Sequence, residues 1–300
     1  MAVLVLGGAG FIGSRVIRLM SEKNLNPISF DLFHSALVEE DIKWVKANIL
    51  DPSTIERTLF EYEVDSIVHL IGLPAIPYCT KNPQLSFLLN VVSVQNTLEA
   101  MRKGDVKKIV FASSAAVYGT TKRPKRVNED SPTKVTTVYG YHKLAAEKLI
   151  EMYAENYGIR YIILRLFNVY GGDFSTGKDI ISIFIRKALN GENLEVFGAR
   201  KFRDFIHIRD VSEAFVKSLE KEVPNSIFCI ASGRKTTLQE LAEIFKEIMG
   251  VRVEYKPSVD DGTGIVADIS KAKKLLNFSP KLPKVGIKEY VLSSIKSCTE

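Results

Sequence analysis

The chain has 300 residues, of which 46% are hydrophobic and 25% charged, so it forms one large globular domain or two. Its 41 Lys and Arg residues outnumber 35 Asp and Glu residues, which leaves a formal net charge of +6. This excess is compatible with an anionic ligand such as a nucleotide, although a solvated, lysine-rich surface accounts for most of it. The composition excludes a disordered chain.

Three cysteines, Cys79, Cys229 and Cys298, are too few and too widely spaced for a metal or disulfide pattern, which indicates a reducing compartment. No apolar run reaches the length of a membrane span. The sequence begins directly with an apolar strand, which argues against a signal peptide. We therefore expect a cytoplasmic protein without a bound metal and without a membrane partner.

The first half of the chain alternates short apolar runs with helical patterns. The expected strands are Ala2–Leu6, Pro27–Asp31, Ile42–Lys46, Ser66–Leu70, Lys108–Ala112 and Tyr161–Leu166. The expected helices are Ser14–Glu22, Pro52–Glu61 with a cap at Asp51, Pro83–Lys103 and Tyr139–Tyr157. This alternation predicts an α/β fold with a doubly wound parallel sheet, the Rossmann arrangement, covered by helices on both faces.

The second half is less regular and predicts a smaller α/β lobe interleaved with the first. The expected helices are Ile180–Leu189, Leu238–Met249, Ser270–Leu276 and Val285–Ser297, and the expected strands are Leu194–Phe197, Ser226–Ile230 and a segment near Val251–Tyr255. Ile206 is expected to begin a return to the main sheet. We predict a cofactor-binding domain of residues 1–167 plus 204–231, and a substrate-binding lobe of residues 168–203 plus 232–300.

A glycine-rich turn follows the first expected strand and leads into a helix. Gly7, Gly10 and Gly13 lie in this turn. A strand, a glycine turn and a helix start are typical of a dinucleotide site, where backbone N–H groups hold the pyrophosphate. Asp31 ends the next strand, where a carboxylate binds the ribose hydroxyls and repels a 2′-phosphate. The sequence therefore predicts NAD rather than NADP, with an ordinary structural turn as the alternative.

Tyr139 and Lys143 are four residues apart on an expected helix, so their side chains share one face. A cation beside a phenol favours the phenolate, so we expect Lys143 to lower the pKa of Tyr139 and allow proton exchange near neutral pH. Ser114 follows the fifth expected strand, at the sheet edge where ligands bind, and its hydroxyl can donate to a substrate oxygen. Each signal is weak alone, since a polar turn is the alternative for the serine.

Together and in this order, these features resemble the extended short-chain dehydrogenases/reductases. More narrowly, they resemble the NAD-dependent sugar epimerase/dehydratase family, whose type activity interconverts UDP-glucose and UDP-galactose. The similarity runs nearly end to end, and it also includes the segments His69–Gly72, Asn90–Val92, Arg165–Gly171, Arg203–Ile208 and Ala267–Ala272.

The resemblance implies roles for individual residues. Tyr139 would be the acid/base, Lys143 would tune it and contact the ribose, and Ser114 would supply a second hydroxyl. The implied cofactor contacts are Gly7, Gly10, Phe11, Ile12, Gly13, Asp31, Asn48, Ile49, Leu70, Asn90, Tyr139 and Lys143. The implied substrate contacts are Ser114 at the reacting oxygen, Asn168 and Arg203 near the diphosphate, and Phe197 near the base. Core packing, a capped turn and an ion pair with Asp204 are the alternatives for Phe197, Asn168 and Arg203.

Some positions depart from the family pattern. Ala115 and Ala116 stand where sugar 4,6-dehydratases carry Asp and Glu, which argues against water elimination. Asn48 replaces an aspartate that contacts adenine, although an amide can make a similar contact. Ser258 stands roughly where a late arginine grips the substrate phosphates, which weakens the expected grip on a diphosphate. Ile265 falls near a position that limits sugar size, and a medium aliphatic side chain there is compatible with N-acetylated sugars.

The sequence thus predicts NAD-dependent epimerisation at C4 of a nucleotide sugar through a transient 4-keto intermediate. The resemblance implies a homodimer that uses the helices Pro83–Lys103 and Tyr139–Tyr157. One alternative is an NAD-dependent dehydrogenase or reductase of a small alcohol or amino acid, which the missing late arginine favours. Another is a non-catalytic NAD-binding sensor, which the combination of Ser114, Tyr139 and Lys143 argues against.

The basic residues around Pro124 are the remaining feature of interest: Lys122, Arg123, Lys125 and Arg126. Charge alone predicts at most a weak, salt-sensitive interaction with nucleic acid. A solvated loop is the simpler interpretation, so no nucleic-acid partner is expected.

Overall fold

The computed structural model describes residues 1–34, 41–121, 123, 125–259 and 261–297. Lys122 and Pro124 of the basic stretch and Cys298 lie outside the described residues. The chain divides into two compact units. Unit 1 comprises Met1–Gly119, Pro132–Arg165 and Ser212–Phe228, and unit 2 comprises Thr120–Ser131, Leu166–Val211 and Cys229–Glu300.

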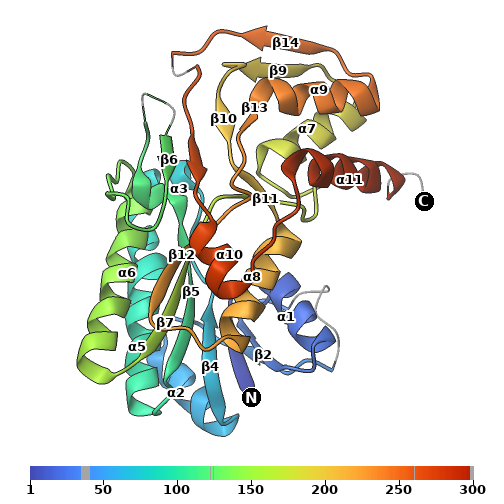
Figure 1. The fold of residues 1–300 in the computed structure, drawn as a ribbon. Coiled ribbons are helices and arrows are strands. Elements are labelled where there is room, and N and C mark those ends of the chain that lie inside the picture. The colour runs from blue at the N-terminus through green and yellow to red at the C-terminus, as the bar shows by residue number, and fades with distance from the viewer. Residues whose placement is uncertain (35–40, 122, 124, 260, 298–300) are drawn as a thin grey trace. The chain divides into compact units, whose positions relative to one another are not determined.

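Unit 1 is built around a seven-stranded sheet in the order β12-β7-β5-β4-β1-β2-β3 (Figure 1). Its strands are β1 (Ala2–Leu6), β2 (Asn26–Asp31), β3 (Trp44–Lys46), β4 (Val64–His69), β5 (Lys108–Ser114), β7 (Arg160–Leu166) and β12 (Ser226–Ile230). β1 pairs in parallel with β2 and β4, and every residue of β1 is buried because helices cover both faces. The predicted doubly wound sheet is confirmed, with its strand order reversing between β1 and β4.

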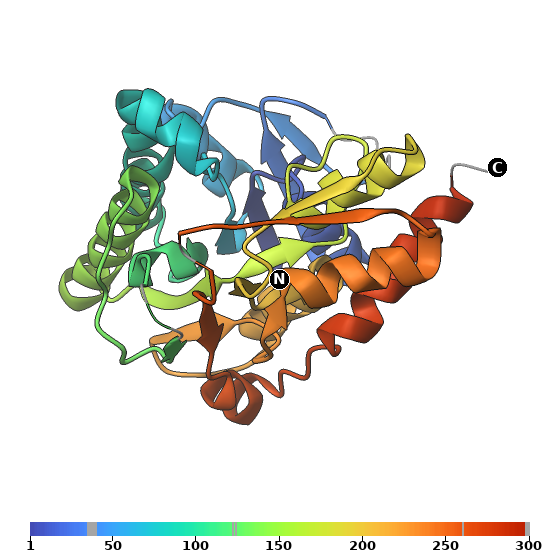
Figure 2. The same ribbon diagram turned by 90° about the horizontal axis from the view of Figure 1, so that it is seen from above.

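Helices cover both faces of this sheet. On one face α2 (Pro52–Glu61), α5 (Ser93–Lys103) and α6 (Val138–Tyr157) lie side by side (Figures 1 and 2). On the other face lie α1 (Gly13–Glu22) and α8 (Ile208–Glu220). This arrangement leaves the carboxyl ends of β1, β4 and β5 as the edge at which a ligand can bind.

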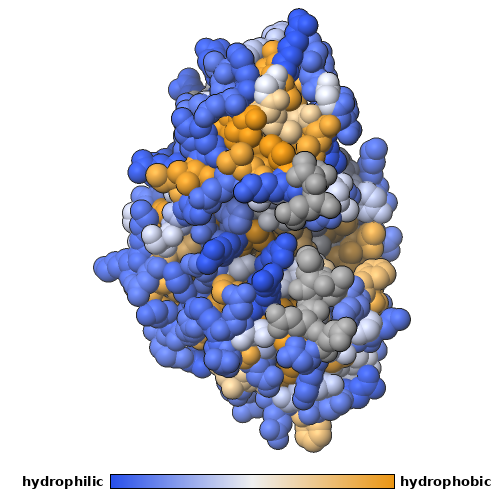
Figure 3. Space-filling view, turned by 90° about the vertical axis from the view of Figure 1, so that its right-hand side faces the viewer, coloured by the Kyte–Doolittle hydropathy of each residue, from blue (hydrophilic) through white to orange (hydrophobic). Residues whose placement is uncertain are grey.

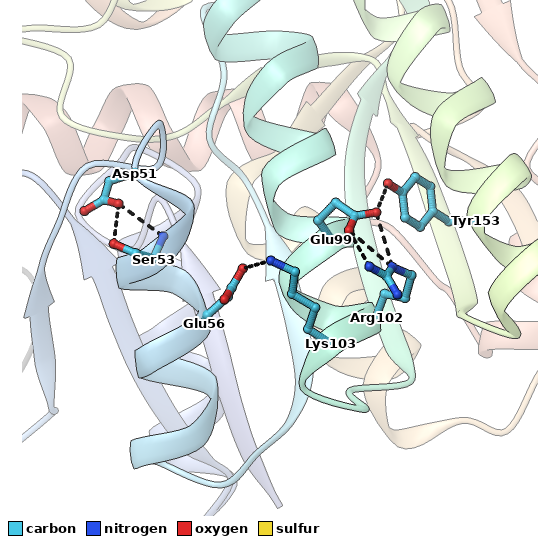
Figure 4. Close-up of polar contacts among 7 residues, drawn as sticks. All are labelled: Asp51, Ser53, Glu56, Glu99, Arg102, Lys103 and Tyr153. Atoms are coloured by element: carbon cyan, nitrogen blue, oxygen red, sulfur yellow. Dashed lines mark hydrogen bonds and ion pairs between the residues drawn. The ribbon is translucent and has the colours of Figure 1, made fainter.

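Polar contacts join the three helices on the first face (Figure 4). Lys103 Nζ of α5 lies 2.6 Å from Glu56 Oε1 of α2, and the Tyr153 hydroxyl of α6 donates to Glu99 of α5. Asp51 caps α2 as predicted, because its Oδ1 accepts from Ser53 N at 3.1 Å. The exposed ion pair between α5 and α2 adds little stability, and the Tyr153 hydrogen bond links α6 to α5.

Unit 2 is the smaller α/β lobe that the sequence predicts. Its helices are α7 (Ile180–Leu189), α9 (Leu238–Met249), α10 (Ser270–Leu276) and α11 (Pro283–Lys296). Its strands form four two-stranded sheets: β11 (Phe205–His207) with β8 (Asn168–Tyr170), β14 (Val253–Lys256) with β9 (Leu194–Phe197), β15 (Ile265–Ala267) with β6 (Lys125–Val127), and β10 (Phe202–Arg203) with β13 (Thr236–Thr237). Its core lies between α7, α9 and α11, where Phe184 and Phe245 meet edge to face.

The segments 120–131, 166–167, 204–211 and 229–231 belong to unit 2, whereas the sequence predicted them in the cofactor-binding domain. The prediction that Ile206 returns to the main sheet is wrong, because β11 pairs in parallel with β8 and Ile206 lies opposite Val169. The buried carboxylate of Asp204 holds the start of β11 there, since it accepts from the N–H groups of Ser232 and Ala267. Residues 125–127 also belong to unit 2, because they form β6, which pairs with β15 of that unit.

No helix among the described residues combines the length and the apolar character needed to cross a bilayer. Figure 3 shows one face of the molecule, on which hydrophilic residues predominate and a hydrophobic area lies in the upper part of the view. Exposed apolar side chains of unit 2 include Ile183, Leu189 and Leu292.

Candidate active site

The glycine turn after β1 has the shape that a dinucleotide phosphate requires. Gly7 has φ +88°, which favours glycine, and a Cβ on Gly13 would lie 2.0 Å from the Gly7 carbonyl oxygen. Helix α1 therefore begins directly against the turn. Among the described residues no side chain caps its N-terminus, so no side chain competes with a phosphate there, although Ser14 N already donates to the Gly10 carbonyl at 3.1 Å. Next to Gly10, Phe11 is 47% exposed and Ile12 is partly buried.

Asp31 at the end of β2 lies against this turn. Its Oδ2 accepts from Ala9 N at 3.1 Å, and its Oδ1 accepts from Phe33 N at 3.3 Å. Leu70 follows β4 and donates from its N–H to the Leu6 carbonyl at 2.9 Å. The structure thus gathers the predicted phosphate and ribose contacts at one edge of the sheet.

The predicted adenine contacts lie in the loop after β3. Asn48 is exposed, and its Oδ1 accepts from Leu50 N at 3.0 Å, while Ile49 is buried. Trp44, the single tryptophan of the chain, lies nearby in sequence on β3, with its ring 5.0 Å from that of His34. The close approach of Gly13 to Gly7, the helix start without a side-chain cap and the exposed amide of Asn48 are the features that an adenine dinucleotide would use.

Tyr139 and Lys143 are both buried on α6, which Thr137 caps by accepting from Gly140 N at 3.1 Å. Lys143 Nζ donates to the Ala112 carbonyl of β5 at 2.8 Å. It also lies 4.6 Å from the centre of the Phe111 ring. The helix therefore presents both side chains to the carboxyl end of β5, as the four-residue spacing predicts.

Ser114 ends β5 and begins a 3₁₀ turn, η2 (Ala115–Tyr118). Its Oγ accepts from Ala116 N at 3.1 Å, which fixes the hydroxyl and leaves its proton free to be donated. A hydrogen bond with Ser114 acts to lower the pKa of Tyr139. Ser114 and Tyr139 thus lie together, as a shared contact with one reacting oxygen requires.

The expected lowering of the Tyr139 pKa is wrong for the chain alone. Burial raises the pKa of Tyr139 to about 12, because a phenolate loses its hydration there, and the bond with Ser114 offsets only part of this. Burial also lowers the pKa of Lys143 to about 8, although the carboxylate of Glu147 acts in the opposite direction. Desolvation is therefore the largest influence on the pKa of both Tyr139 and Lys143.

Asn90 lies in a π-helical turn, η1 (Leu88–Val92), which splits the predicted helix 83–103 between α4 (Pro83–Phe87) and α5. Its Oδ1 accepts from Leu73 N at 3.1 Å, and its Nδ2 donates to Ser86 O at 3.0 Å. A Cβ on Gly72 would lie 2.7 Å from Asn90 Oδ1 and 3.3 Å from Lys143 Nζ. The backbone at Gly72, after β4, therefore packs against the side chains of Asn90 and Lys143 and leaves no room for a side chain at this position.

His69, at the end of β4, is a fully buried neighbour of Lys143. Burial first and the Lys143 charge second lower the pKa of His69 to about 3. Neither ring nitrogen has a hydrogen-bond partner among the described residues, and the ring packs on Phe111 with its centroid 5.7 Å away. His69 is thus neutral and does not supply a second acid at neutral pH.

In unit 2, Asn168 and Arg203 line one cavity of about 280 Å³, together with Val169, Asp179, Ile180, Phe205 and Leu238. Arg203 Nη1 donates to the Phe202 carbonyl at 2.9 Å. Asp179 caps α7, where its Oδ1 accepts from Ile181 N at 3.0 Å and Ser182 N at 3.1 Å. Arg203 is thus the cationic residue among the described lining of this cavity.

Phe197 on β9 does not line this cavity in the described part of the chain. It is 53% exposed, which excludes core packing, and Lys256 Nζ lies 5.5 Å from its ring centre. The sequence also missed Asp179, Gly72 and the π-helical turn. The family resemblance could have pointed to Gly72, because it includes the segment His69–Gly72. No sequence signal could have found Asp179, because a helix cap looks the same in sequence whether or not it lines a cavity.

The comparisons with known proteins agree with this geometry. Residues 3–231 match the sequence model described as the NAD dependent epimerase/dehydratase family. The chain belongs to this family. Over 96% of its length it is 36% identical to a Methanocaldococcus jannaschii protein, 97% of which is covered, that is provisionally named a UDP-glucose 4-epimerase.

Two solved structures share the fold over nearly the whole chain. UDP-glucose 4-epimerase of Thermotoga maritima, solved with UDP-glucose, is 30% identical with a TM-score of 0.90 and 100% of each chain covered. UDP-glucose 4-epimerase of Thermus thermophilus, solved with NAD, is 27% identical with a TM-score of 0.88 and 99% of each chain covered. The predicted family, fold and NAD dependence are confirmed.

Proposed function

We propose that the protein epimerises C4 of a UDP-hexose with NAD as its resident cofactor. The observation that carries this proposal is the meeting of Ser114, Tyr139 and Lys143 at the sheet edge that also holds the glycine turn. This combination provides a proton carrier beside a dinucleotide site.

Each of these residues has a distinct task in the reaction. Tyr139 acts as the phenolate, a form that the positive charges of bound NAD⁺ and Lys143 would favour: it takes the proton of the sugar 4-hydroxyl and later returns it, while the Ser114 hydroxyl donates to the same oxygen. Lys143, held by the Ala112 carbonyl, supplies positive charge beside the phenol and binds ribose. Bound at the glycine turn, NAD would supply the site that takes the hydride from C4 and returns it to the 4-keto sugar. Ala115 and Ala116 supply no acid or base for water elimination, so the sugar keeps its hydroxyl groups.

The functional test is incubation of the purified protein with UDP-glucose or UDP-galactose, followed by NMR of the sugars and identification of the bound cofactor. We expect the two sugars to interconvert without accumulation of NADH. NADH that accumulates with a small alcohol or amino acid would instead support the dehydrogenase alternative, and unchanged UDP-sugars with NAD supplied would refute the epimerase. Trp44 is the single tryptophan of the chain, so a change in protein fluorescence when NAD is added would be a readout of cofactor binding that does not depend on turnover.

We propose that the cavity of unit 2 holds the substrate diphosphate. Replacing Arg203 with Met is expected to raise the KM for a UDP-sugar about 30-fold, because a charged hydrogen bond to phosphate contributes about 2 kcal/mol. Steady-state kinetics would show this with kcat nearly unchanged. Arg200→Met is the matched control, since Arg200 is exposed and pairs with Asp261 at 2.8 Å. Equal KM values for the two variants would contradict the assignment.

We propose that the protein forms a homodimer through α4, α5 and α6. Exposed apolar side chains on α4 and α6 support this: Leu85, Phe87, Tyr141 and Met152. Met152→Glu is expected to shift the protein from dimer to monomer in sedimentation equilibrium. Phe60→Glu on α2 is the control, because Phe60 is 89% exposed yet lies off this surface. A monomeric wild type, or a dimeric Met152→Glu variant, would refute this interface.

A further inference from the structure

A buried ion pair lies directly behind the catalytic residues of unit 1. Glu147 of α6 and Arg165 of β7 form two hydrogen bonds, from Arg165 Nε to Oε1 at 3.1 Å and from Nη2 to Oε2 at 2.7 Å. Their side chains are 0% and 5% exposed. A pair of this geometry holds two elements in a fixed register.

The pair also holds the strand end that carries Ser114. Ser113 Oγ donates to Glu147 Oε1, and Arg165 Nη1 donates to the Tyr118 hydroxyl at 3.0 Å. Ser113 precedes Ser114 on β5, and Tyr118 ends the turn that Ser114 caps. The ion pair thus binds Ser113 and Tyr118, which lie on either side of Ser114 in the sequence.

Glu147 is also one turn beyond Lys143 on the same face of α6, so the carboxylate and the ammonium are neighbours. Among the described residues of unit 1, Glu147 is the only buried carboxylate, whereas Lys143 and Arg165 are both buried cations. A buried pair gives little stability compared with apolar side chains of similar volume. Because the pair lies beside the catalytic residues and contributes little stability, we infer that it positions those residues.

We propose that Glu147 is a positioning residue: with Arg165 it fixes Ser114 relative to Tyr139 and Lys143, and its carboxylate is the buried counter-charge of the Lys143 ammonium. The proposal rests on the proposed function, since it assigns Glu147 a task in the same reaction. Four ionisable groups face Lys143 from the elements around it: Glu147 and Tyr139 of α6, His69 of β4 and Cys79 of α3 (Ile76–Lys81). Of these, Glu147 is the carboxylate, and among the groups that oppose the effect of burial on the Lys143 pKa it has the largest influence.

The test is Glu147→Gln in the NAD-loaded protein. We expect kcat to fall about tenfold, because Ser114 would shift relative to Tyr139 and Lys143. The KM for the UDP-sugar and the amount of bound NAD should stay unchanged, because the residues that bind the substrate diphosphate are not altered. The loss of the anion lowers the pKa of Lys143 further, so the alkaline limb of the kcat profile should move to lower pH by about one unit. Glu151→Gln is the matched control, since Glu151 lies one turn further along the same helix, where its side chain is 23% exposed and pairs with the exposed Lys148.

A second variant separates positioning from folding. Glu147→Leu with Arg165→Met replaces the pair by apolar side chains and should fold, yet keep the low kcat and the shifted alkaline limb. Wild-type kinetics in this double variant, or in Glu147→Gln, would overturn the proposal. The pKa of Lys143, followed by NMR of labelled lysine, tests the counter-charge without any turnover. If the wild type does not epimerise, the proposed function is refuted. The Lys143 titration would still test whether Glu147 is the counter-charge of Lys143.

Discussion

Replacement of Tyr139 by Phe is expected to lower kcat for UDP-sugar epimerisation about 1000-fold, because it removes the hydroxyl that exchanges the proton. Tyr139 is 8% exposed, and Phe fills the same volume, so the fold and the bound NAD should be kept. Circular dichroism and cofactor release would establish this before kinetics are measured. A non-catalytic NAD sensor would keep its ligand response in this variant.

Tyr153→Phe is the matched control on the same helix. The Tyr153 hydroxyl donates to Glu99 and accepts from Gln95, so its loss should cost about 1 kcal/mol of stability and leave kcat unchanged. A Tyr139→Phe protein that keeps more than about a tenth of the wild-type kcat would exclude Tyr139 as the acid/base.

The same pair of proteins measures the Tyr139 pKa directly. The ultraviolet difference between wild type and Tyr139→Phe should show a phenol that ionises near pH 12 without cofactor, because burial outweighs the bond with Ser114. The nicotinamide ring of NAD⁺ is positively charged, so we expect a lower Tyr139 pKa in the NAD-loaded protein. A titration that is the same with and without NAD would show that the cofactor charge does not reach the phenol.

The elements with clear end signals could be predicted from the sequence. Helix α2 has the predicted bounds, since Asp51 and Pro52 mark its start and both act locally. Helix α8 (Ile208–Glu220) was not predicted, because it follows β11 at His207 without an intervening turn. The π-helical turn at Asn90 was also missed, since one extra residue in a turn leaves the apolar pattern of a long helix almost unchanged.

The candidate site shows the same limit. The spacing of Tyr139 and Lys143 and the position of Ser114 follow from local periodicity, and the structure brings these three residues together. The direction of the Tyr139 pKa could not be predicted, because it depends on burial by elements distant in sequence. The Glu147–Arg165 pair joins a helix to a later strand, and each residue alone is an ordinary charged side chain in the sequence.

Lys143→Met is expected to lower kcat about 100-fold and to change how stability depends on pH. Burial lowers the pKa of Lys143 from 10.5 to about 8, so between these values the unfolded chain binds a proton that the folded chain does not. Wild-type stability therefore gains from this site as pH rises from 8 to 10.5, and the gain is lost as pH falls through 8. The shift corresponds to about 3 kcal/mol.

Methionine carries no charge, so the free energy of unfolding of Lys143→Met does not change with pH through this site. The difference in free energy of unfolding, variant minus wild type, should therefore be largest at neutral pH and should fall by about 3 kcal/mol as pH approaches 10.5. The unpaired Ala112 carbonyl costs the variant a similar amount at every pH, so it shifts the difference without changing its slope. Urea unfolding of both proteins across this range measures the difference, with Lys148→Met, 66% exposed on the same helix, as the control that should show no slope. A difference that stays constant would mean that Lys143 is hydrated in the folded protein, and its charge would then have too little influence to tune Tyr139.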